Sequence, residues 1–323
     1  MTMISTCKRA VLSGAGLTKE EALALYEEPL EQLCAAADEI RRHFCGNAFD
    51  ICIIVNGKSG RCPENCKYCA QSSFYRTEIK SFPLLSTTEL LSQAKYNDKR
   101  GILRYSIVTS GKALCDGEIE SVCQSVRAIK EETGLHVCVS LGLLTETQFK
   151  RLREAGVTRV HNNLETSRSY FPSVCTTHSY DDKIKAIRAA QSAGLRVCSG
   201  GIMGLGESPR DRVDLALTLR ELGIKSVPIN LLNPIPGTPY EKNPRLSDDE
   251  LRRIVAVFRF LLPDASIRLA GGRGLLKDKG RSCFVSGANA AISGDMLTTS
   301  GISIETDMRL LRELSYQPAL WKE

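Results

Sequence analysis

The sequence predicts an α/β fold, a TIM-type (β/α)8 barrel preceded by a helical N-terminal extension. Eight short apolar segments alternate with amphipathic helical segments along the chain. This alternation is typical of parallel strands joined by crossover helices. The length of 323 residues suits one barrel of about 250 residues with extensions at both ends. No segment has the composition of a linker that would divide the chain into two parts.

The N-terminal extension is predicted over residues 1–48. Thr18 and Glu21 have the spacing of a capping box, in which each residue satisfies a free backbone N–H at the start of a helix. The barrel is predicted over residues 49–300. A C-terminal helix is predicted over residues 301–323, centred on 304–315.

The barrel strands are predicted where apolar and β-branched residues cluster between turn signals. They lie near residues 49–55, 103–108, 136–141, 159–164, 196–202, 226–231, 266–270 and 288–293. Helices between them are expected to begin after Ser86, Thr145, Ser179, Ser208 and Ser247, each of which has a capping partner three residues later.

The composition excludes several classes of protein. With 42% hydrophobic and 25% charged residues, the chain is expected to fold as a globular protein. A net charge of +6 gives no basis for nucleic-acid binding. No apolar run is long enough for a membrane span, and no export signal precedes the extension, so a cytoplasmic location is expected. Thirteen cysteines in such a chain favour metal or redox chemistry.

The predicted barrel interior carries unusual side chains. Because alternate residues of a strand face opposite sides, aliphatic neighbours facing the helices would direct four polar residues into the lumen. These four are Cys52, Cys138, Asn230 and Arg268, and we expect Arg104, Ser106 and Cys198 to join them. A buried arginine needs partners for its charge. The lumen is therefore expected to hold a polar or anionic group.

A cysteine loop follows the first strand. Cys62, Cys66 and Cys69 have C-x3-C-x2-C spacing, at the end of the barrel where active sites lie. Three thiolates at this spacing can hold three corners of a 4Fe–4S cluster and leave the fourth iron open. A structural zinc site is the alternative, but it would need a fourth ligand, and the neighbouring sequence offers none.

The stretch GKSGRCPENCKYCAQSS at residues 57–73 resembles the signature of the radical S-adenosylmethionine (SAM) superfamily, and most closely that of the biotin synthases. The resemblance extends from about residue 40 to the C-terminus. Further matching segments lie at residues 161–167, 175–180, 197–207, 227–230, 237–239, 267–269 and 297–299.

The resemblance implies a reaction. SAM would chelate the open iron, and electron transfer from the cluster would generate a 5′-deoxyadenosyl radical. The radical would abstract hydrogen from dethiobiotin, and sulfur from an auxiliary cluster would be inserted to form biotin. The same resemblance implies an electron donor such as flavodoxin or ferredoxin, and a homodimer.

The resemblance also implies roles for individual residues. Tyr68 would lie against the adenine of SAM, and Glu165 would bind its ribose hydroxyls. The adenine-binding strand would include Gly200, Ile202 and Gly204. Substrate contacts are expected from Asn163, Asn230, Thr298 and Thr299, and the two asparagines suit the ureido ring of dethiobiotin.

The auxiliary cluster departs from the family pattern. In the family, strands two, three and five supply cysteines and strand seven supplies an arginine. This sequence has Cys138, Cys198 and Arg268 but Ser106 on strand two, and serine is a poorer ligand for iron–sulfur clusters. We therefore hypothesise that Cys52 replaces the missing ligand, in a 2Fe–2S or larger cluster. Alternatively, Cys52 fills the core and sulfur insertion has been lost. A role for Cys175 as a ligand is left open.

Two other functions compete with this interpretation. One is another radical SAM barrel enzyme, of the hydrogenase-maturase or methylornithine-synthase type. The other is an iron–sulfur redox protein without catalysis. Cys138, Cys198 and Arg268 favour the sulfur-inserting enzyme, because only that reaction requires a sulfur source in the lumen.

Overall fold

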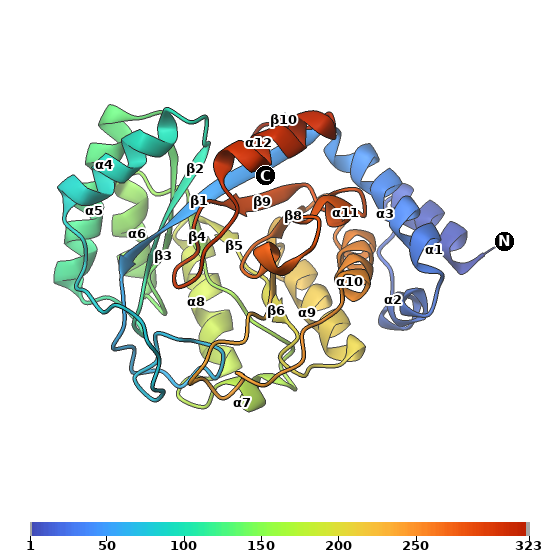
Figure 1. The fold of residues 1–323 in the computed structure, drawn as a ribbon, viewed down its shortest axis with the longest axis horizontal. Helices are drawn as coiled ribbons and strands as arrows, with labels where there is room; N and C mark the ends of the chain where they lie inside the picture. The colour runs from blue at the N-terminus through green and yellow to red at the C-terminus, as the bar shows by residue number, and fades with distance from the viewer. Residues whose placement is uncertain (1, 321–323) are drawn as a thin grey trace.

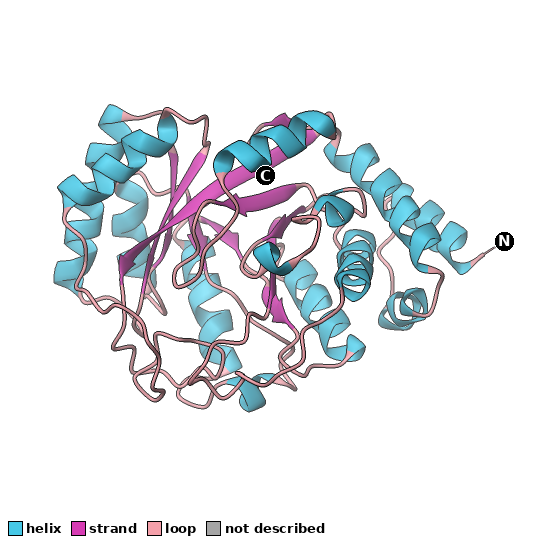
Figure 2. Ribbon diagram, in the orientation of Figure 1, coloured by secondary structure: helices cyan, strands magenta, loops and turns pink. Residues whose placement is uncertain are grey.

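A closed barrel of parallel strands forms the centre of the molecule, in a computed structural model that describes residues 2–320. The strand order is β10-β1-β2-β3-β4-β5-β7-β8-β9, β6 pairs with β7, and pairing of β1 with β9 closes the ring. Figure 2 shows the helices arranged outside the strands. The strands are β1 (Ala48–Lys58), β2 (Arg104–Thr109), β3 (His136–Ser140), β4 (Arg159–His161), β5 (Arg196–Cys198), β6 (Gly201–Met203), β7 (Ser226–Leu231), β8 (Ser266–Leu269), β9 (Ala290–Ser293) and β10 (Gln317–Pro318).

The predicted barrel is confirmed, with one difference on its fifth strand. The segment predicted as one strand over 196–202 is divided into β5 and β6 at Ser199 and Gly200. Gly200 lies so close to β7 that a Cβ atom would be 1.9 Å from the carbonyl oxygen of Pro228. The short β10, which the sequence pattern did not predict, pairs with the start of β1.

The helices begin where the capping residues predict. Side chains of Thr18, Ser86, Thr145, Ser179 and Ser208 each accept a backbone N–H and form a complete capping box. The helices are α1 (Met3–Leu12), α2 (Lys19–Tyr26), α3 (Leu30–Cys45), α4 (Thr87–Asp98), α5 (Asp116–Glu132), α6 (Glu146–Glu154), α7 (Phe171–Val174), α8 (Tyr180–Ser192), α9 (Pro209–Glu221), α10 (Asp248–Leu261), η1 (Arg273–Leu275), α11 (Arg281–Phe284) and α12 (Ile304–Glu313).

The N-terminal extension forms three helices that cover one side of the barrel. Helix α3 packs along α10, and α2 packs against α9 and α10 (Figure 1). Arg253 on α10 fixes the turn between α2 and α3, because its guanidinium donates to the carbonyls of Tyr26 and Glu28 at 2.6 and 2.7 Å. The predicted C-terminal helix is α12; residues 321–323 of that prediction lie outside the described residues. The boundaries at residues 48 and 300 stay predictions.

The strands separate two environments, as their alternation predicts. Ile51, Ile53, Val137, Val139 and Ile267 are buried in the apolar layer that includes the helices. Their neighbours in sequence face the lumen instead. In the part of the chain that the structure describes, no helix is long and apolar enough to cross a membrane.

Candidate active site

A cavity of about 390 Å³ occupies the lumen. Every residue predicted to face the lumen lines it, namely Cys52, Arg104, Ser106, Cys138, Cys198, Asn230 and Arg268. The loop after β1 also contributes Cys62, Tyr68 and Cys69. Cys52 lies six residues before the end of β1, about 20 Å along the strand at 3.3 Å per residue. One cavity is therefore lined by cysteines of the loop and by cysteines deeper on the strands.

The floor of the cavity is strongly cationic. Asp50 pairs with Arg104 at 2.9 Å, with Arg268 at 3.1 Å and with Arg159 at 3.8 Å. Burial alone would raise the pKa of Asp50, but the three arginines hold it below its usual value. One carboxylate does not balance three guanidiniums, so these four side chains carry two excess positive charges. Such a site favours anionic groups such as thiolates.

Three buried thiols adjoin this floor. Arg268 Nη1 donates to Cys52 Sγ at 3.2 Å, and Ser226 Oγ donates to Cys198 Sγ at 3.2 Å. Burial raises the pKa of Cys52 to about 11, although the positive charge of Arg268 opposes this shift. Three thiolates that hold a cluster here would carry negative charge, which the buried arginines would offset. The donor set therefore fits an iron–sulfur cluster.

Hydrogen bonds to Gln71 and a tight turn at Gly60 fix the shape of the cysteine loop. The Cys62 N–H donates to the Gln71 carbonyl at 3.0 Å, and the Gly60 N–H donates to the Gln71 side chain at 3.0 Å. Gly60 has a φ of +78°, and a Cβ there would lie 2.5 Å from Ser81 Oγ. All three loop cysteines are free thiols and partly exposed. Three unpaired thiols on one short loop beside the cavity fit a 4Fe–4S cluster.

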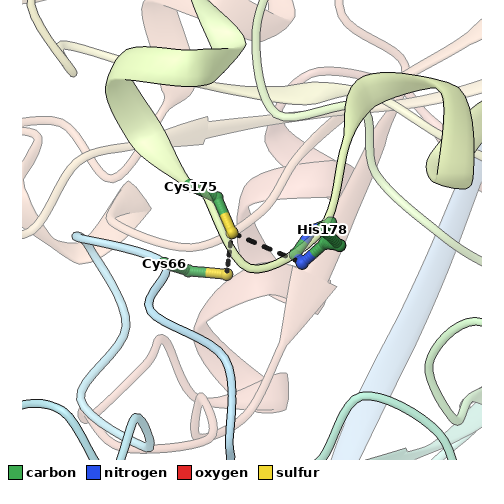
Figure 3. A group of neighbouring side chains, drawn as sticks. All are labelled: Cys66, Cys175 and His178. Carbon is green, nitrogen blue, oxygen red and sulfur yellow. Dashed lines mark hydrogen bonds between the residues drawn. The ribbon is translucent and has the colours of Figure 1, made fainter.

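The loop has a further cysteine beside it, which corrects the expectation that no other metal ligand lies near. Cys66 Sγ lies 3.7 Å from Cys175 Sγ, on the segment between α7 and α8 (Figure 3). His178 Nδ1 lies 3.3 Å from the same sulfur. Sequence spacing could not reveal this contact, because 109 residues separate the two cysteines.

Tyr68 and Glu165 connect the loop to the strand ends. The Tyr68 hydroxyl donates to Glu165 Oε1 at 2.9 Å, and both residues line the cavity. Glu165 has a φ of +70°, a conformation that disfavours side chains with a Cβ. Burial raises the pKa of its carboxyl. A strained, buried carboxylate that faces a cavity is typical of a ligand-binding position.

The predicted substrate contacts all line the cavity, but the two asparagines already have protein partners. Asn163 Oδ1 accepts the Gly200 N–H at 3.0 Å. Asn230 donates to the Gly201 carbonyl at 3.1 Å and accepts the Gly271 N–H at 2.9 Å. An amide has two donor hydrogens and two acceptor positions, so each asparagine retains capacity for a ligand. Thr298 and Thr299 line the cavity from the loop after β9.

The predicted adenine strand has two kinds of residue. Ile202 lines the cavity. Gly200 instead fits against Pro228, and Gly204 adopts a φ of +99° with its N–H donating to Glu207. Close packing against β7 explains why residue 200 is a glycine, and the positive φ explains why residue 204 is one.

Two luminal residues were missed by the sequence analysis. Asp50 precedes Cys52 by two residues, so the alternation that identified Cys52 also places Asp50 on the same face. Arg159 begins the short strand β4, where three residues give too little alternation to assign a face.

Comparisons with known proteins agree with this geometry. The chain matches the Radical SAM superfamily over residues 58–219 and the Biotin and Thiamin Synthesis associated domain over residues 228–317. It is 57% identical to a biotin synthase of Brachyspira hyodysenteriae, over 96% of this chain and 93% of that protein. It is 56% identical to a biotin synthase of Akkermansia muciniphila, over 98% and 99% of the two chains.

Among solved structures, a methylornithine synthase superposes with a TM-score of 0.84 at 22% identity, over 98% of both chains. That likeness shows the shared barrel alone, whereas the full-length sequence identities distinguish between the enzymes of this fold. The predicted family is thereby confirmed: the chain belongs to the biotin synthases of the radical SAM superfamily.

Proposed function

We propose that the chain inserts sulfur into dethiobiotin to form biotin, with an auxiliary cluster held by Cys52, Cys138 and Cys198. The observation that carries this proposal is the presence of two sets of thiols on one cavity. Cys62 and Cys69 line the cavity from the loop, while the three other cysteines line it from the strands. A substrate bound between the two sets would be exposed to both.

The cysteine loop would hold a 4Fe–4S cluster through Cys62, Cys66 and Cys69. When bound, the cluster and SAM supply the 5′-deoxyadenosyl radical, and the auxiliary cluster supplies the sulfur. Glu165 and Tyr68 would orient the SAM ribose and adenine beside the loop. Asn163, Asn230, Thr298 and Thr299 would position dethiobiotin. The barrel wall around the bound substrate would limit the access of water to the reactive carbon.

The position of Cys52 supports it as the third cysteine ligand, in place of the cysteine that is absent at position 106, where the chain has Ser106. Cys52 is buried, lines the cavity and lies 3.2 Å from Arg268 Nη1. Ser106 also lines the cavity, but its hydroxyl is a harder donor that binds iron–sulfur clusters poorly. Arg268 would balance the charge of the cluster or ligate it, and Arg104 and Arg159 would add to the positive field.

The partners of the reaction follow from the same proposal. A flavodoxin or ferredoxin would supply electrons to the cluster at the loop. A homodimer and a cytoplasmic location are also proposed.

Reconstitution of the purified chain with iron and sulfide under anaerobic conditions tests the function. We expect biotin and 5′-deoxyadenosine from dethiobiotin, SAM and a reductant. Replacement of Cys62, Cys66 or Cys69 by Ala should abolish both products, because each thiolate holds one iron. The exposed Cys115 gives the matched control, and Cys115→Ala should retain both products. Formation of 5′-deoxyadenosine by the Cys66→Ala protein would contradict the assignment.

A further inference from the structure

Cys66, Cys175 and His178 form a group of metal-ligating side chains that the proposed reaction does not use as a unit. Their Sγ and Nδ1 atoms all lie within 4.8 Å of one another. Figure 3 shows Cys66 on the cysteine loop directed toward Cys175 and His178, which come from the segment after α7. We infer that the cluster-free chain binds one thiophilic divalent cation, Zn²⁺ or Fe²⁺, through these three residues.

The separation of the two sulfurs matches a shared metal ion. Cys66 Sγ and Cys175 Sγ are 3.7 Å apart. Two thiolates on one tetrahedral metal with bonds of 2.3 Å are ~3.8 Å apart by simple geometry. A disulfide would require about 2.05 Å. The sulfurs would therefore need almost no movement to bind one ion, and His178 Nδ1 at 3.3 Å from Cys175 Sγ offers the third ligand.

The surroundings of Cys175 hold these ligands in place. The thiol is buried, and it contacts Asn65 Oδ1 at 3.4 Å and Thr177 Oγ1 at 3.5 Å. Asn65 Oδ1 also accepts the N–H groups of Thr176 and Thr177 at 2.9 and 3.2 Å. Asn65 thus ties the cysteine loop to the segment that carries Cys175. Both parts of the site are fixed before a metal arrives.

A carboxylate borders the site. Glu64 contacts His178 Nδ1 and accepts from Thr177 Oγ1 at 2.7 Å. Because Nδ1 is the proposed ligand atom, a bound ion would replace the Glu64 contact at that atom, and the carboxylate would then be free to accept a hydrogen bond from a water on the metal. Binding of M²⁺ requires both sulfurs as thiolates and the imidazole neutral, so the protons these groups carry would pass to solvent and the two thiolates would balance the charge of the ion.

An ion at this site would affect assembly of the 4Fe–4S cluster. Cys66 is a ligand both of the single ion and of the proposed cluster. An ion held by Cys66, Cys175 and His178 would therefore occupy the cluster-free loop and compete with cluster assembly. Fe²⁺ there could be incorporated into the cluster, whereas Zn²⁺ would block it.

Metal titration of the cluster-free chain tests the inference independently of the proposed function. The Cys62→Ser/Cys69→Ser protein cannot assemble the cluster but retains all three proposed ligands. We expect it to bind one more equivalent of Zn²⁺ or Co²⁺ than the same protein with Cys175→Ser added. The strand cysteines are present in both proteins, so any metal that they bind does not affect the difference in bound equivalents. Zinc X-ray absorption of that equivalent should show two sulfurs at about 2.3 Å.

Further variants separate a ligand from a merely structural residue. Cys175→Ser and His178→Gln should each weaken binding by at least about 100-fold, because each removes one of the three proposed ligands. Cys115→Ser, which removes an exposed thiol elsewhere, should change nothing.

A competition experiment provides the second readout, on the chain with all its cysteines. One equivalent of Zn²⁺ should slow 4Fe–4S reconstitution, measured from cluster absorbance, and the Cys175→Ser variant should escape this effect. Equal zinc stoichiometry with and without Cys175, or equal inhibition of the two proteins, would overturn the inference.

Discussion

Asp50 is the side chain on which the charge of the barrel floor depends. Its carboxylate is fully buried and pairs with Arg104, Arg159 and Arg268. Removal of one member of a buried ionic group leaves the remaining charges unpaired, which costs several kcal/mol. A cluster on the strand cysteines would add negative charge to the same group. The stability of the chain and the presence of that cluster should therefore be coupled.

Asp50→Asn measures this coupling. We expect the substitution to destabilise the cluster-free chain by about 3–5 kcal/mol, because three guanidiniums would lose their carboxylate. The effect should be smaller in the reconstituted protein. Asp249→Asn is the matched control, since Asp249 is exposed and its pair with Arg252 contributes about 0–1 kcal/mol. Denaturant unfolding measures both changes, and similar values for the two variants would contradict the account of the floor.

Asn230 gives a prediction about substrate binding. Asn230→Ala should weaken dethiobiotin binding by about 10–100-fold, equivalent to about 1–3 kcal/mol for unpaired polar groups. SAM binding should change little, because the SAM contacts are assigned to Tyr68, Glu165 and Ile202. Equilibrium binding of each ligand to the reconstituted protein provides the measurement. An equal loss of both affinities would assign Asn230 to folding, through its bonds to Gly201 and Gly271.

The break between β5 and β6 divides what would be one continuous strand in a regular barrel. Gly200 at the break approaches the β7 backbone so closely that any side chain would collide with it. The break places Cys198 before it and Ile202 after it, and both line the cavity. The glycine thus serves both the strand packing and the position of two site residues.

Gly200→Ala should therefore destabilise the chain by at least about 1–3 kcal/mol, the usual cost of overpacking. Gly117 in α5 is a matched control, because a Cβ there would meet no atom within 4 Å. Gly117→Ala should change the stability of the chain by no more than about 0.5 kcal/mol, because Gly117 is the second residue of α5 and its Cβ would lie in open space. Thermal or denaturant unfolding compares the two, and wild-type stability of Gly200→Ala would refute the argument.

Those parts of the fold and the site that depend on local sequence could be predicted. Alternation along strands predicted Cys52, Cys138 and Arg268 in the lumen, because period two needs only the local sequence. Capping pairs predicted the starts of α2, α4, α6, α8, α9 and α10 for the same reason, although at Ser247 only the serine side chain makes its bond. The contact between Cys66 and Cys175 could not be predicted, since it depends on how two distant loops meet above the barrel. The break at Gly200 was also missed, because its cause is the carbonyl of Pro228 on another strand.

The whole molecule brings two cysteine sets to one cavity, with Cys62 and Cys69 from the loop and Cys52, Cys138 and Cys198 from the strands. The loop set has C-x3-C-x2-C spacing, whereas Ser106 stands at the strand-two position where the resemblance leads us to expect a cysteine. If Cys52 supplies the missing ligand, the auxiliary cluster shifts from β2 toward β1 and remains next to Arg268. The fold would then accommodate a different ligand set without changing its strands.

Iron content and product formation of the anaerobically reconstituted Cys52→Ser protein test the role of Cys52 as a cluster ligand. We expect loss of the auxiliary cluster and of biotin formation, with 5′-deoxyadenosine production retained. Cys283→Ser, which alters a buried cysteine on α11, is the control and should keep both clusters. Unchanged iron content and unchanged biotin formation in Cys52→Ser would contradict the account.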